Sequence, residues 1–563
     1  MAICGIDLGT TNSLISVIEG GKPKLIPNVL GAFLTPSCVG LDEEGNVLTG
    51  QAAKERLITH PDITVSSFKR LMGSPVTTAL GKFNFRPEEL SQFILKALKA
   101  DAEAVLGEPV EEVVISVPAY FNDPQRKATL DAGKLAGLNV NRLVNEPTAA
   151  ALAYGLGDLP EGKYLIFDLG GGTFDVSILH KYEDVMEIRA TTGDSMLGGD
   201  DFDTVIETMI AEKGGFDPEK LSPHDRARLT RAAETLKLSL SAAHEVPYVL
   251  SLGGRKQEGL LTREAFEAEC AGLIRRLRRP LELALADAKL DPNSFDAVVL
   301  AGGATRAPMV RALVARLFGR LPLSHIDPDT IVALGAAAQA GLIKRQGDLK
   351  DIVMTDVCPF TLGIQAVDMS NPTDPNAFVA PIIQRNAVIP ISRSIKLATA
   401  QDNQPNILVQ VYQGENLRPE DNIHLGSLKF DLPRQPKGKE YIEVRFTYDI
   451  SGALEVEVFV PSTGSRESRI FRNASGLTLH ELEASFRALS AIKLHPRERM
   501  ENKTLLTRAH RIYAEQTQDN RHALRRHILQ FEANIASQTL RDASEIRVEF
   551  SRLLDRFESS IFG

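Results

Sequence analysis

The chain has 563 residues, which is too many for one compact core and enough for two or three domains. Hydrophobic residues make up 43% and charged residues 24% of the sequence, a balance typical of folded globular proteins that excludes an intrinsically disordered chain. The net charge of -9 argues against a broad basic surface, so we expect no nucleic-acid partner.

From the start of the chain to about residue 344, short apolar strands alternate with longer helical patterns. Residues 113–117 predict a strand, residues 123–136 a helix and residues 142–144 a further strand. This alternation predicts an α/β domain.

The next segment, residues 347–356, is a linker with an apolar centre. Ile352, Val353 and Met354 are bracketed by Asp351 and Asp356. A solvated linker has no need of apolar residues, so we expect this one to dock on a neighbouring domain, either in one functional state or permanently.

From about residue 357 to residue 470, apolar and polar residues alternate. Ile442, Val444 and Phe446 fall on one face of a strand, and residues 454–460 repeat the pattern after a turn at Ser451 and Gly452. A period of two predicts antiparallel sheet with one buried face, and we expect a β-sandwich-like domain.

After Gly476 the pattern becomes helical. Thr478 and Glu481 have the spacing of a capping box, which predicts a helix start. A later stripe of apolar residues at helical spacing predicts one buried helix face, and the neighbouring basic cluster is interpreted as a solvated face. The stripe is Leu524, Ile528, Phe531 and Ile535, and the basic cluster is Arg521, Arg525 and Arg526.

Two strand–turn–strand segments of the α/β region carry the same order of chemical groups. One is IDLGTT from Ile6, and the other is FDLGGGT from Phe167. A repeat with Asp7 matched to Asp168 predicts a duplicated domain, with one hairpin in each of two lobes that enclose a cleft.

The composition of these turns is that of a phosphate site. Glycines let backbone N–H groups approach phosphate oxygens, and threonines add hydroxyl donors. The aspartates would repel phosphate unless a hard cation lay between them, so hydrated Mg²⁺ with ATP is the expected ligand. The glycines are Gly9, Gly170, Gly171 and Gly172, the threonines Thr10, Thr11 and Thr173, and the aspartates Asp7, Asp168 and Asp175. A plain tight hairpin is the alternative for either turn taken alone.

A third glycine element, at residues 298–306, joins an apolar strand to a turn suited to a base or ribose. The sequence contains no Gly-x-Ser-x-Gly nucleophile elbow and no HExxH pair, so serine-hydrolase and zinc-protease chemistry are not indicated.

The four cysteines are widely scattered, which indicates small buried hydrophobes in a reducing compartment. They are Cys4, Cys38, Cys270 and Cys358. No run of about 18 apolar residues and no basic, then apolar, N-terminal segment is present, so we expect a cytoplasmic protein without a membrane partner.

Taken together, these segments resemble the seventy-kilodalton heat-shock chaperone family, whose bacterial type member is DnaK. The similarity is carried by GIDLGTTNS from Gly5, FKRLMG from Phe68, VISVPAYFND from Val114, RLVNEPTAAALAYG from Arg142, FDLGGGTFDVS from Phe167, LGGDDFD from Leu197, AGGATRAP from Ala301, DIVMTDVCPFTLGI from Asp351 and VYQGEN from Val411. The match reaches to about residue 480. The short helical tail and the Met-Thr-Asp linker look most like the HscC branch.

The resemblance implies roles for individual residues in the cleft. Lys69, Glu146, Asp168 and Thr173 would act in ATP hydrolysis. Asp7, Asp168 and Asp175 would hold the shell of magnesium and potassium. Nucleotide would be bound by Gly9, Thr10, Thr11, Asn12, Gly170, Gly171, Gly172, Thr173, Gly199, Glu234, Lys237, Ser241, Gly302, Gly303, Arg306 and Asp329. Leu238 replaces an arginine of the family that stacks on adenine, which predicts weaker nucleotide binding.

The resemblance also implies how the domains communicate and what they bind. Pro118 and Arg126 would report the nucleotide state, and a J-domain co-chaperone would bind near Arg142 and Asp356. A nucleotide exchange factor is a further expected partner. Unfolded polypeptide would lie in a cleft formed by Ile364, Val367, Leu397, Ala400, Ile407, Val409 and Ile442, although these positions could also be ordinary sandwich core.

We therefore predict a two-lobed, actin-like ATPase domain at residues 1–345, a linker at 346–356, a β-sandwich peptide-binding domain at 357–476 and a short helical lid at 477–563. The predicted function is that of an ATP-dependent chaperone for extended hydrophobic segments. Sugar kinases, acetate-type kinases and actin-like filament proteins share the two-hairpin cleft, but they need neither the sandwich nor the tail. An exchange factor without its own ATPase cycle is disfavoured by Lys69, Glu146, Asp168 and Thr173.

Overall fold

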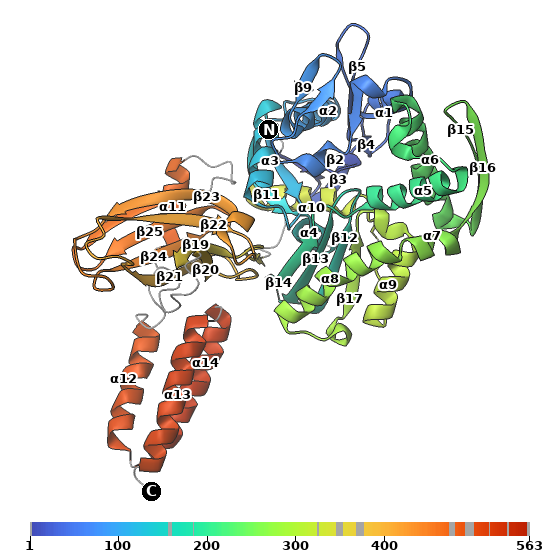
Figure 1. Cartoon of the computed structure of the whole chain (residues 1–563). Helices are drawn as coiled ribbons and strands as arrows, with labels where there is room; N and C mark the ends of the chain where they lie inside the picture. Colours follow the sequence, from blue (N-terminus) through green and yellow to red (C-terminus); the bar gives the residue numbers. More distant parts are fainter. Residues whose placement is uncertain are drawn as a thin grey trace.

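A computed structural model shows the architecture of the chain (Figure 1). It describes residues 3–155, 160–183, 185–323, 326–344, 353–367, 377–471, 479–489, 500–516, 518–537 and 540–559.

The α/β region consists of two lobes, each built on one sheet. The strand order is β11-β10-β1-β2-β3 in lobe I and β17-β12-β13-β14-β18 in lobe II. In each sheet an antiparallel hairpin, β1–β2 or β12–β13, pairs through its first strand with a parallel neighbour, β10 or β17. The same pairing in both lobes agrees with the predicted duplication. The lobe I strands are β1 Ile3–Asp7, β2 Asn12–Glu19, β3 Lys22–Ile26, β10 Glu112–Val117 and β11 Asn139–Asn145, and the lobe II strands are β12 Gly162–Leu169, β13 Phe174–Tyr182, β14 Val185–Asp194, β17 Ala297–Ala301 and β18 Val353–Thr355.

Two helices, α4 (Glu146–Gly155) and α10 (Ile331–Lys344), join the lobes through one hydrophobic cluster that also contains residues of both sheets. The packing is very close: a Cβ on Gly335 of α10 would lie 1.7 Å from the carbonyl oxygen of Ala149 in α4. A Cβ on Gly5 of β1 would lie 2.1 Å from the backbone nitrogen of Ala337. Only glycine allows these elements to approach so closely, and the approach places both hairpin turns beside one another.

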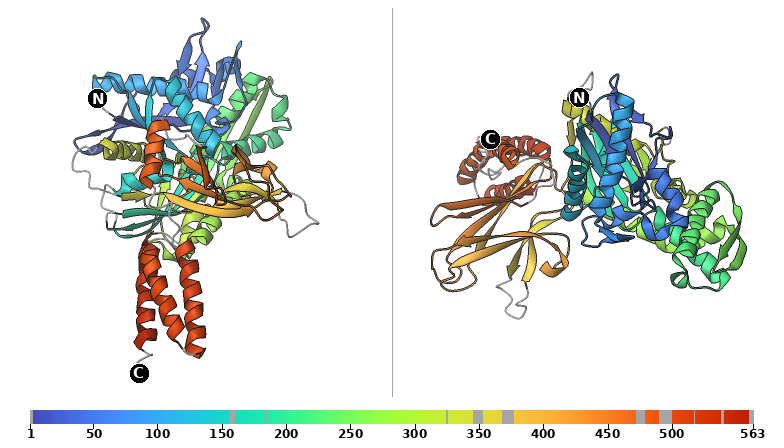
Figure 2. Two further views of the ribbon diagram at one scale, coloured as in Figure 1. Left: turned by 90° about the vertical axis from the view of Figure 1, so that its left-hand side faces the viewer. Right: turned by 90° about the horizontal axis from the view of Figure 1, so that it is seen from above.

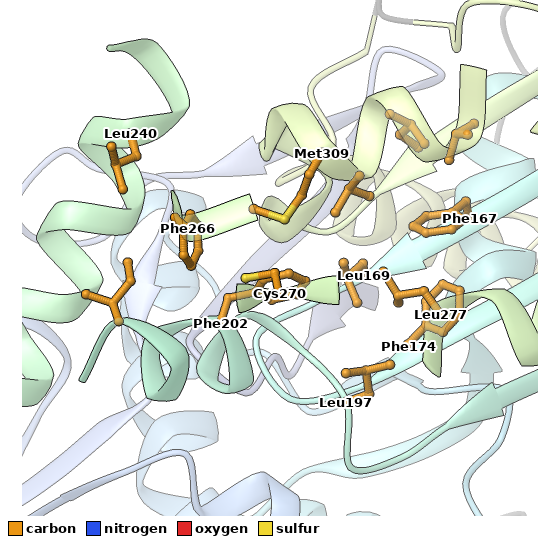
Figure 3. Packing of buried hydrophobic residues seen from close by; sticks show 14 of the residues in the cluster. Phe167, Leu169, Phe174, Leu197, Phe202, Leu240, Phe266, Cys270, Leu277 and Met309 are labelled. Atoms are coloured by element: carbon orange, nitrogen blue, oxygen red, sulfur yellow. The ribbon is translucent and has the colours of Figure 1, made fainter. Parts of the chain in front are cut away.

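Lobe II contains a large buried cluster that supports its hairpin (Figure 3). Phe167 and Phe174, on the two strands of the hairpin, lie with ring centroids 4.7 Å apart. Phe202 adds to the same cluster from helix α5 (Gly199–Gly214). Burial of these rings fixes the turn between β12 and β13 relative to the start of α5.

Residues 357–471 form two antiparallel sheets of four strands, ordered β20-β19-β22-β23 and β21-β24-β25-β26. Both sheets contribute to one shared core. The predicted buried face is confirmed, since Ile442, Val444 and Phe446 are at most 2% exposed. The expectation of only one buried face is wrong at Thr447, which is buried on the opposite face and whose hydroxyl lies 3.1 Å from that of Ser392. The strands are β19 Leu362–Val367, β20 Ala377–Ile383, β21 Ile391–Ala398, β22 Asn406–Gln413, β23 Ile423–Asp431, β24 Tyr441–Tyr448, β25 Leu454–Val460 and β26 Ser465–Ile470.

The tail is helical, as expected. Helix α11 (Leu479–Ala488) packs through Leu482 and Phe486 on Ala453 of the two-sheet domain. Helices α12 (Met500–Glu515), α13 (Gln518–Ser537) and α14 (Leu540–Ser559) form a bundle with its own core beside that domain (Figures 1 and 2). The predicted stripe is confirmed, because its four residues on α13 are at most 6% exposed. Thr478 of the predicted capping box lies outside the described residues.

Two smaller findings concern the cysteines and membrane spans. All four cysteines are buried and free, and burial raises the pKa of Cys4, Cys38 and Cys270 to about 12. Among the described helices, none is long and apolar enough to cross a bilayer.

Candidate functional site

A cavity of about 880 Å³ lies between the two lobes. Both hairpin turns line it, together with the segment that follows β17 and one side of α6 (Pro223–Ala242). Most sequence-predicted site residues meet here: Asp7, Gly9, Thr10, Thr11, Asn12, Lys69, Glu146, Asp168, Gly170, Gly171, Thr173, Gly199, Glu234, Lys237, Gly302, Gly303, Arg306 and Asp329. Gly172, Asp175 and Ser241 are not among the lining residues.

The two turns face each other across the cavity floor. A Cβ on Gly171 of the second turn would lie 2.0 Å from Oγ1 of Thr11 in the first. A Cβ on Gly9 would lie 2.0 Å from the carbonyl oxygen of Asn12. Glycine is therefore required at both positions, and it leaves backbone N–H groups open to an anion.

Three carboxylates lie beneath these turns. Burial raises the pKa of Asp7 to about 7, with a further contribution from the charge of Glu146, and the same two causes raise the pKa of Asp175 to about 7. Asp168 is buried, and its pKa is raised in the same way. Ser116 donates to Asp7 (2.9 Å) and the Tyr120 N–H to Asp175 (3.0 Å), whereas Oδ2 of Asp168 has no hydrogen-bond partner in the described structure. Buried carboxylates of this kind call for a cation.

Direct metal ligation by a cluster of side chains is not seen among the residues that the structure describes. In the described part of the chain, no group of three His, Cys, Asp or Glu side chains lies close enough to hold a metal together. Mg²⁺ dehydrates reluctantly and usually keeps several of its waters, so it does not require such a cluster.

Lys69 lies next to the carboxylates and is almost fully buried. Its Nζ donates to Oε1 of Glu146 at 2.9 Å, and the two side chains are 4% and 9% exposed. Nζ also lies 5.5 Å from the centroid of the Phe121 ring. A charged amine held this way presents a fixed positive charge that would suit an anion in the cavity.

The other end of the cavity has the residues expected around a nucleoside. Nζ of Lys237 lies 2.7 Å from Oδ2 of Asp203, and Nη2 of Arg306 lies 2.8 Å from Oδ2 of Asp329. Leu238 is 61% exposed and lines the cavity, which Arg226, Arg231 and Arg306 also line. Ser241 is further away on α6 and donates to the carbonyl oxygen of Lys237 at 3.2 Å. Its predicted place at the nucleotide is therefore not supported by the cavity lining.

Sequence reasoning missed a contact that closes the cavity. Lys54 of α1 (Gly50–Thr59) in lobe I lies 3.0 Å from Glu234 of α6 in lobe II. The two residues are far apart in sequence and have no local pattern, so only the fold reveals the pair.

The linker is docked on lobe II. Its strand β18 pairs in parallel with β14, with Val353 opposite Val185, and Met354 packs against the cluster between the lobes. Ile352 lies outside the described residues. Docking of this segment agrees with the expectation from its apolar composition.

A chain of hydrogen bonds joins the linker to the loop over the carboxylates. Oδ2 of Asp356 accepts from Nδ2 of Asn145 (2.7 Å) and from Oγ1 of Thr148 (3.1 Å). Arg126 donates to Oδ1 of Asn145 (2.6 Å) and to the carbonyl oxygen of Phe121 (3.0 Å). Phe121 contacts Lys69, so the chain connects the linker with the cavity.

Arg142 lies on the same side of lobe I. It faces the charges of Asp449 and Asp356, and burial lowers its pKa. A cavity of about 260 Å³ is lined by Arg142, Asp449 and Ser485 of α11, among others.

The two-sheet domain contacts lobes I and II through the segments before β19 and after β20 and through the end of β22. Arg385 lies against Asp287 of α8 (Ala271–Ala288), with Nε to Oδ2 at 2.9 Å and Nη2 to Oδ1 at 3.0 Å. Oε1 of Gln413 accepts from the N–H of Asp123 at 3.0 Å. The rings of Tyr120 and Phe360 lie 4.4 Å apart, so this domain touches the residue beside Phe121.

The predicted peptide positions divide into two groups. Ile364, Val409 and Ile442 are buried in the shared core, and Leu397 and Ile407 pack against it. Val367 and Ala400 are exposed. Strand β19 pairs with β22 only over Leu362–Ile364, although both strands continue further, so they separate near Val367 and Ile407.

Comparison with known proteins gives one consistent result. The family model described as "Hsp70 protein" matches residues 3–79 and 75–555. The chain is 43% identical over 516 residues to "Chaperone protein dnaK3" of Thermosynechococcus vestitus, covering 85% of this chain and 74% of that protein. It is 42% identical over 515 residues to "Chaperone protein dnaK" of Cyanidioschyzon merolae, covering 85% and 83%. The chain therefore belongs to the Hsp70 family and is an ATP-dependent chaperone with ATPase activity.

Proposed function

We propose that the interlobe cavity hydrolyses ATP with Mg²⁺ and K⁺ and that hydrolysis controls the grip of the two-sheet domain on extended apolar segments of unfolded proteins. The observation that carries this proposal is the docked linker strand, which connects the two domains through Asp356 and Asn145.

In the proposed reaction, the glycine turns and Thr10, Thr11 and Thr173 hold the phosphates. The positive charge of Lys69 lies near the γ-phosphate, and Glu146 holds the lysine in place. Glu146 and Asp168, with Thr173, orient the attacking water. Asp7, Asp168 and Asp175 would hold Mg²⁺, which would neutralise the charge of the phosphates when bound. Phosphoryl transfer needs positioning and charge neutralisation more than covalent chemistry, which this set of groups supplies.

The proposed boundaries are 1–345 for the ATPase domain, 346–356 for the linker, 357–476 for the peptide-binding domain and 477–563 for the lid. Peptide would enter where β19 and β22 separate, using backbone groups for affinity and Ile407 as an aliphatic pocket. Arg142 and Asp356 would contact a J-domain co-chaperone, and a nucleotide exchange factor is a further proposed partner. The Met-Thr-Asp linker at residues 354–356 supports a place in the HscC branch.

The test is ATP turnover of the full chain with and without an unfolded, aliphatic-rich peptide, each in Mg²⁺ with K⁺ or Na⁺. We expect peptide to raise turnover and K⁺ to support it better than Na⁺. A rate that peptide leaves unchanged would contradict the proposed coupling.

A further inference from the structure

Arg70 follows Lys69 on the same short 3-10 turn, Phe68–Leu71, and reaches from lobe I to lobe II. Its Nη2 donates to the carbonyl oxygen of Met196 (2.8 Å) and to Oδ2 of Asp201 (3.1 Å). Nη1 lies 3.8 Å from Oδ2 of Asp200. The guanidinium therefore ties the turn that carries Lys69 to the opposite lobe.

The stem of Arg70 lies against the second phosphate turn. A Cβ on Gly172 would come within 2.7 Å of Cγ and 3.0 Å of Cδ of Arg70. The Nε of Arg70 is buried and has no hydrogen-bond partner in the described structure. The side chain thus fills the gap between the lobes next to the phosphate end of the cavity, and its Nε–H is not used in a hydrogen bond there.

The partners of Arg70 belong to the element that holds this turn. Oδ2 of Asp201 caps α5 by accepting from the Gly198 N–H at 2.8 Å. The next two N–H groups of α5 donate to the turn itself, Gly199 to the carbonyl of Gly170 (2.9 Å) and Asp200 to that of Gly171 (2.8 Å). A shift of α5 relative to Arg70 is therefore a shift of the phosphate turn relative to Lys69.

We propose that Arg70 is a positioning residue for hydrolysis: its bridge to Asp201 sets the place of Lys69 relative to the second phosphate turn when the lobes close. The inference rests on the proposed roles of Lys69 and Thr173. A charge pair that bridges two lobes and is largely shielded from water fixes their geometry more strongly than a surface pair does. The side chains of Arg70 and Asp201 are only 18% and 20% exposed, so this pair is of the shielded kind.

The test compares Arg70→Met with Arg276→Met in the full chain. Met keeps the apolar stem over Gly172 and removes the guanidinium. Arg276 is the matched control because it donates to the same Met196 carbonyl (3.3 Å) and to Asp194 (2.7 Å) but belongs to lobe II, as do both partners. We expect Arg70→Met to slow single-turnover hydrolysis about tenfold, as misplacement of a catalytic group does. ATP affinity should change much less, and Arg276→Met should hydrolyse at the parent rate.

Three further variants separate positioning from a structural role. Asp201→Asn keeps the cap, since an amide oxygen still accepts from Gly198, and it should slow hydrolysis without adding to Arg70→Met. Arg70→Lys should restore part of the rate. Parent-like hydrolysis in Arg70→Met, or additive losses in the double variant, would overturn the assignment. If Lys69→Ala slows hydrolysis but Arg70→Met does not, only the role of Arg70 is refuted. If Lys69→Ala hydrolyses ATP at the parent rate, the proposed active site is refuted as well.

Discussion

The docked linker offers a direct test of how the two domains communicate. Met354 packs half-buried against the cluster that joins the lobes, and its strand pairs with β14 at Met186. Replacing Val353 and Met354 by Asp places two charges on this strand. Full burial of a Met side chain stabilises by about 1.5–3 kcal/mol. The variant would lose roughly half of this burial energy and would have to desolvate a carboxylate. Together these effects would weaken docking by about 2 kcal/mol, which lowers the docking equilibrium constant about thirtyfold.

We therefore expect the double variant to lose peptide stimulation of ATP turnover while basal hydrolysis and peptide binding persist. Leu321→Asp is the matched control, because this lobe II leucine is 83% exposed and should tolerate the same change. Turnover with a peptide titration is the assay, and thermal unfolding is measured alongside. Stimulation equal to that of the parent chain would refute the role of docking. A large drop in the melting temperature of the whole chain would instead identify a linker that packs permanently.

Four other outcomes are expected. Thr173→Ala and Lys69→Ala should bind ATP but slow single-turnover hydrolysis at least tenfold, about 1.4 kcal/mol of barrier; normal rates would contradict the proposed site. Leu238→Arg should slow nucleotide dissociation in stopped-flow by restoring a cation over the adenine, worth about 0.5–2 kcal/mol, and an unchanged off-rate would show that another group fills this role. Ile407→Asp should weaken binding of an aliphatic peptide at least tenfold, because it buries a charge in the proposed pocket. Leu408→Asp changes a half-exposed neighbour and should leave the affinity unchanged. If both variants bind the peptide equally well, the peptide binds elsewhere. Ending the chain at residue 490 removes the whole α12–α14 bundle without splitting its core and should speed release of peptide from the ADP form, because a lid raises the barrier to release; release at the rate of the full chain would rule out a lid.

Local chemistry explains what could be predicted from the sequence. The two hairpins were identifiable because each places glycine, threonine and aspartate within a few residues, and the α13 stripe because its helical period is local. The pairs Lys54–Glu234 and Arg70–Asp201 were not, since each joins residues more than 100 positions apart that meet only after the lobes assemble.

Other site residues could not be assigned from the sequence because one pattern fits two different structures. Alternation in β22 and β24 predicts burial of Val409 and Ile442, but a period of two is the same for a sandwich core and for a peptide cleft. Ser241 fits a nucleoside-binding pattern by position, yet on a helix a serine hydroxyl can instead bond to the carbonyl four residues earlier, as it does here to Lys237.

The parallel pairing of β18 with β14 also affects solubility. When the linker leaves, β14 becomes the edge of the lobe II sheet, and its unpaired N–H and C=O groups are open to a strand from another molecule. Glu187 and Arg189 on β14 form an ion pair at 3.2 Å, and charged residues on an edge discourage such pairing. A chaperone that handles extended polypeptide thus has a strand-accepting edge of its own, and Val353–Thr355 cover that edge in the docked state.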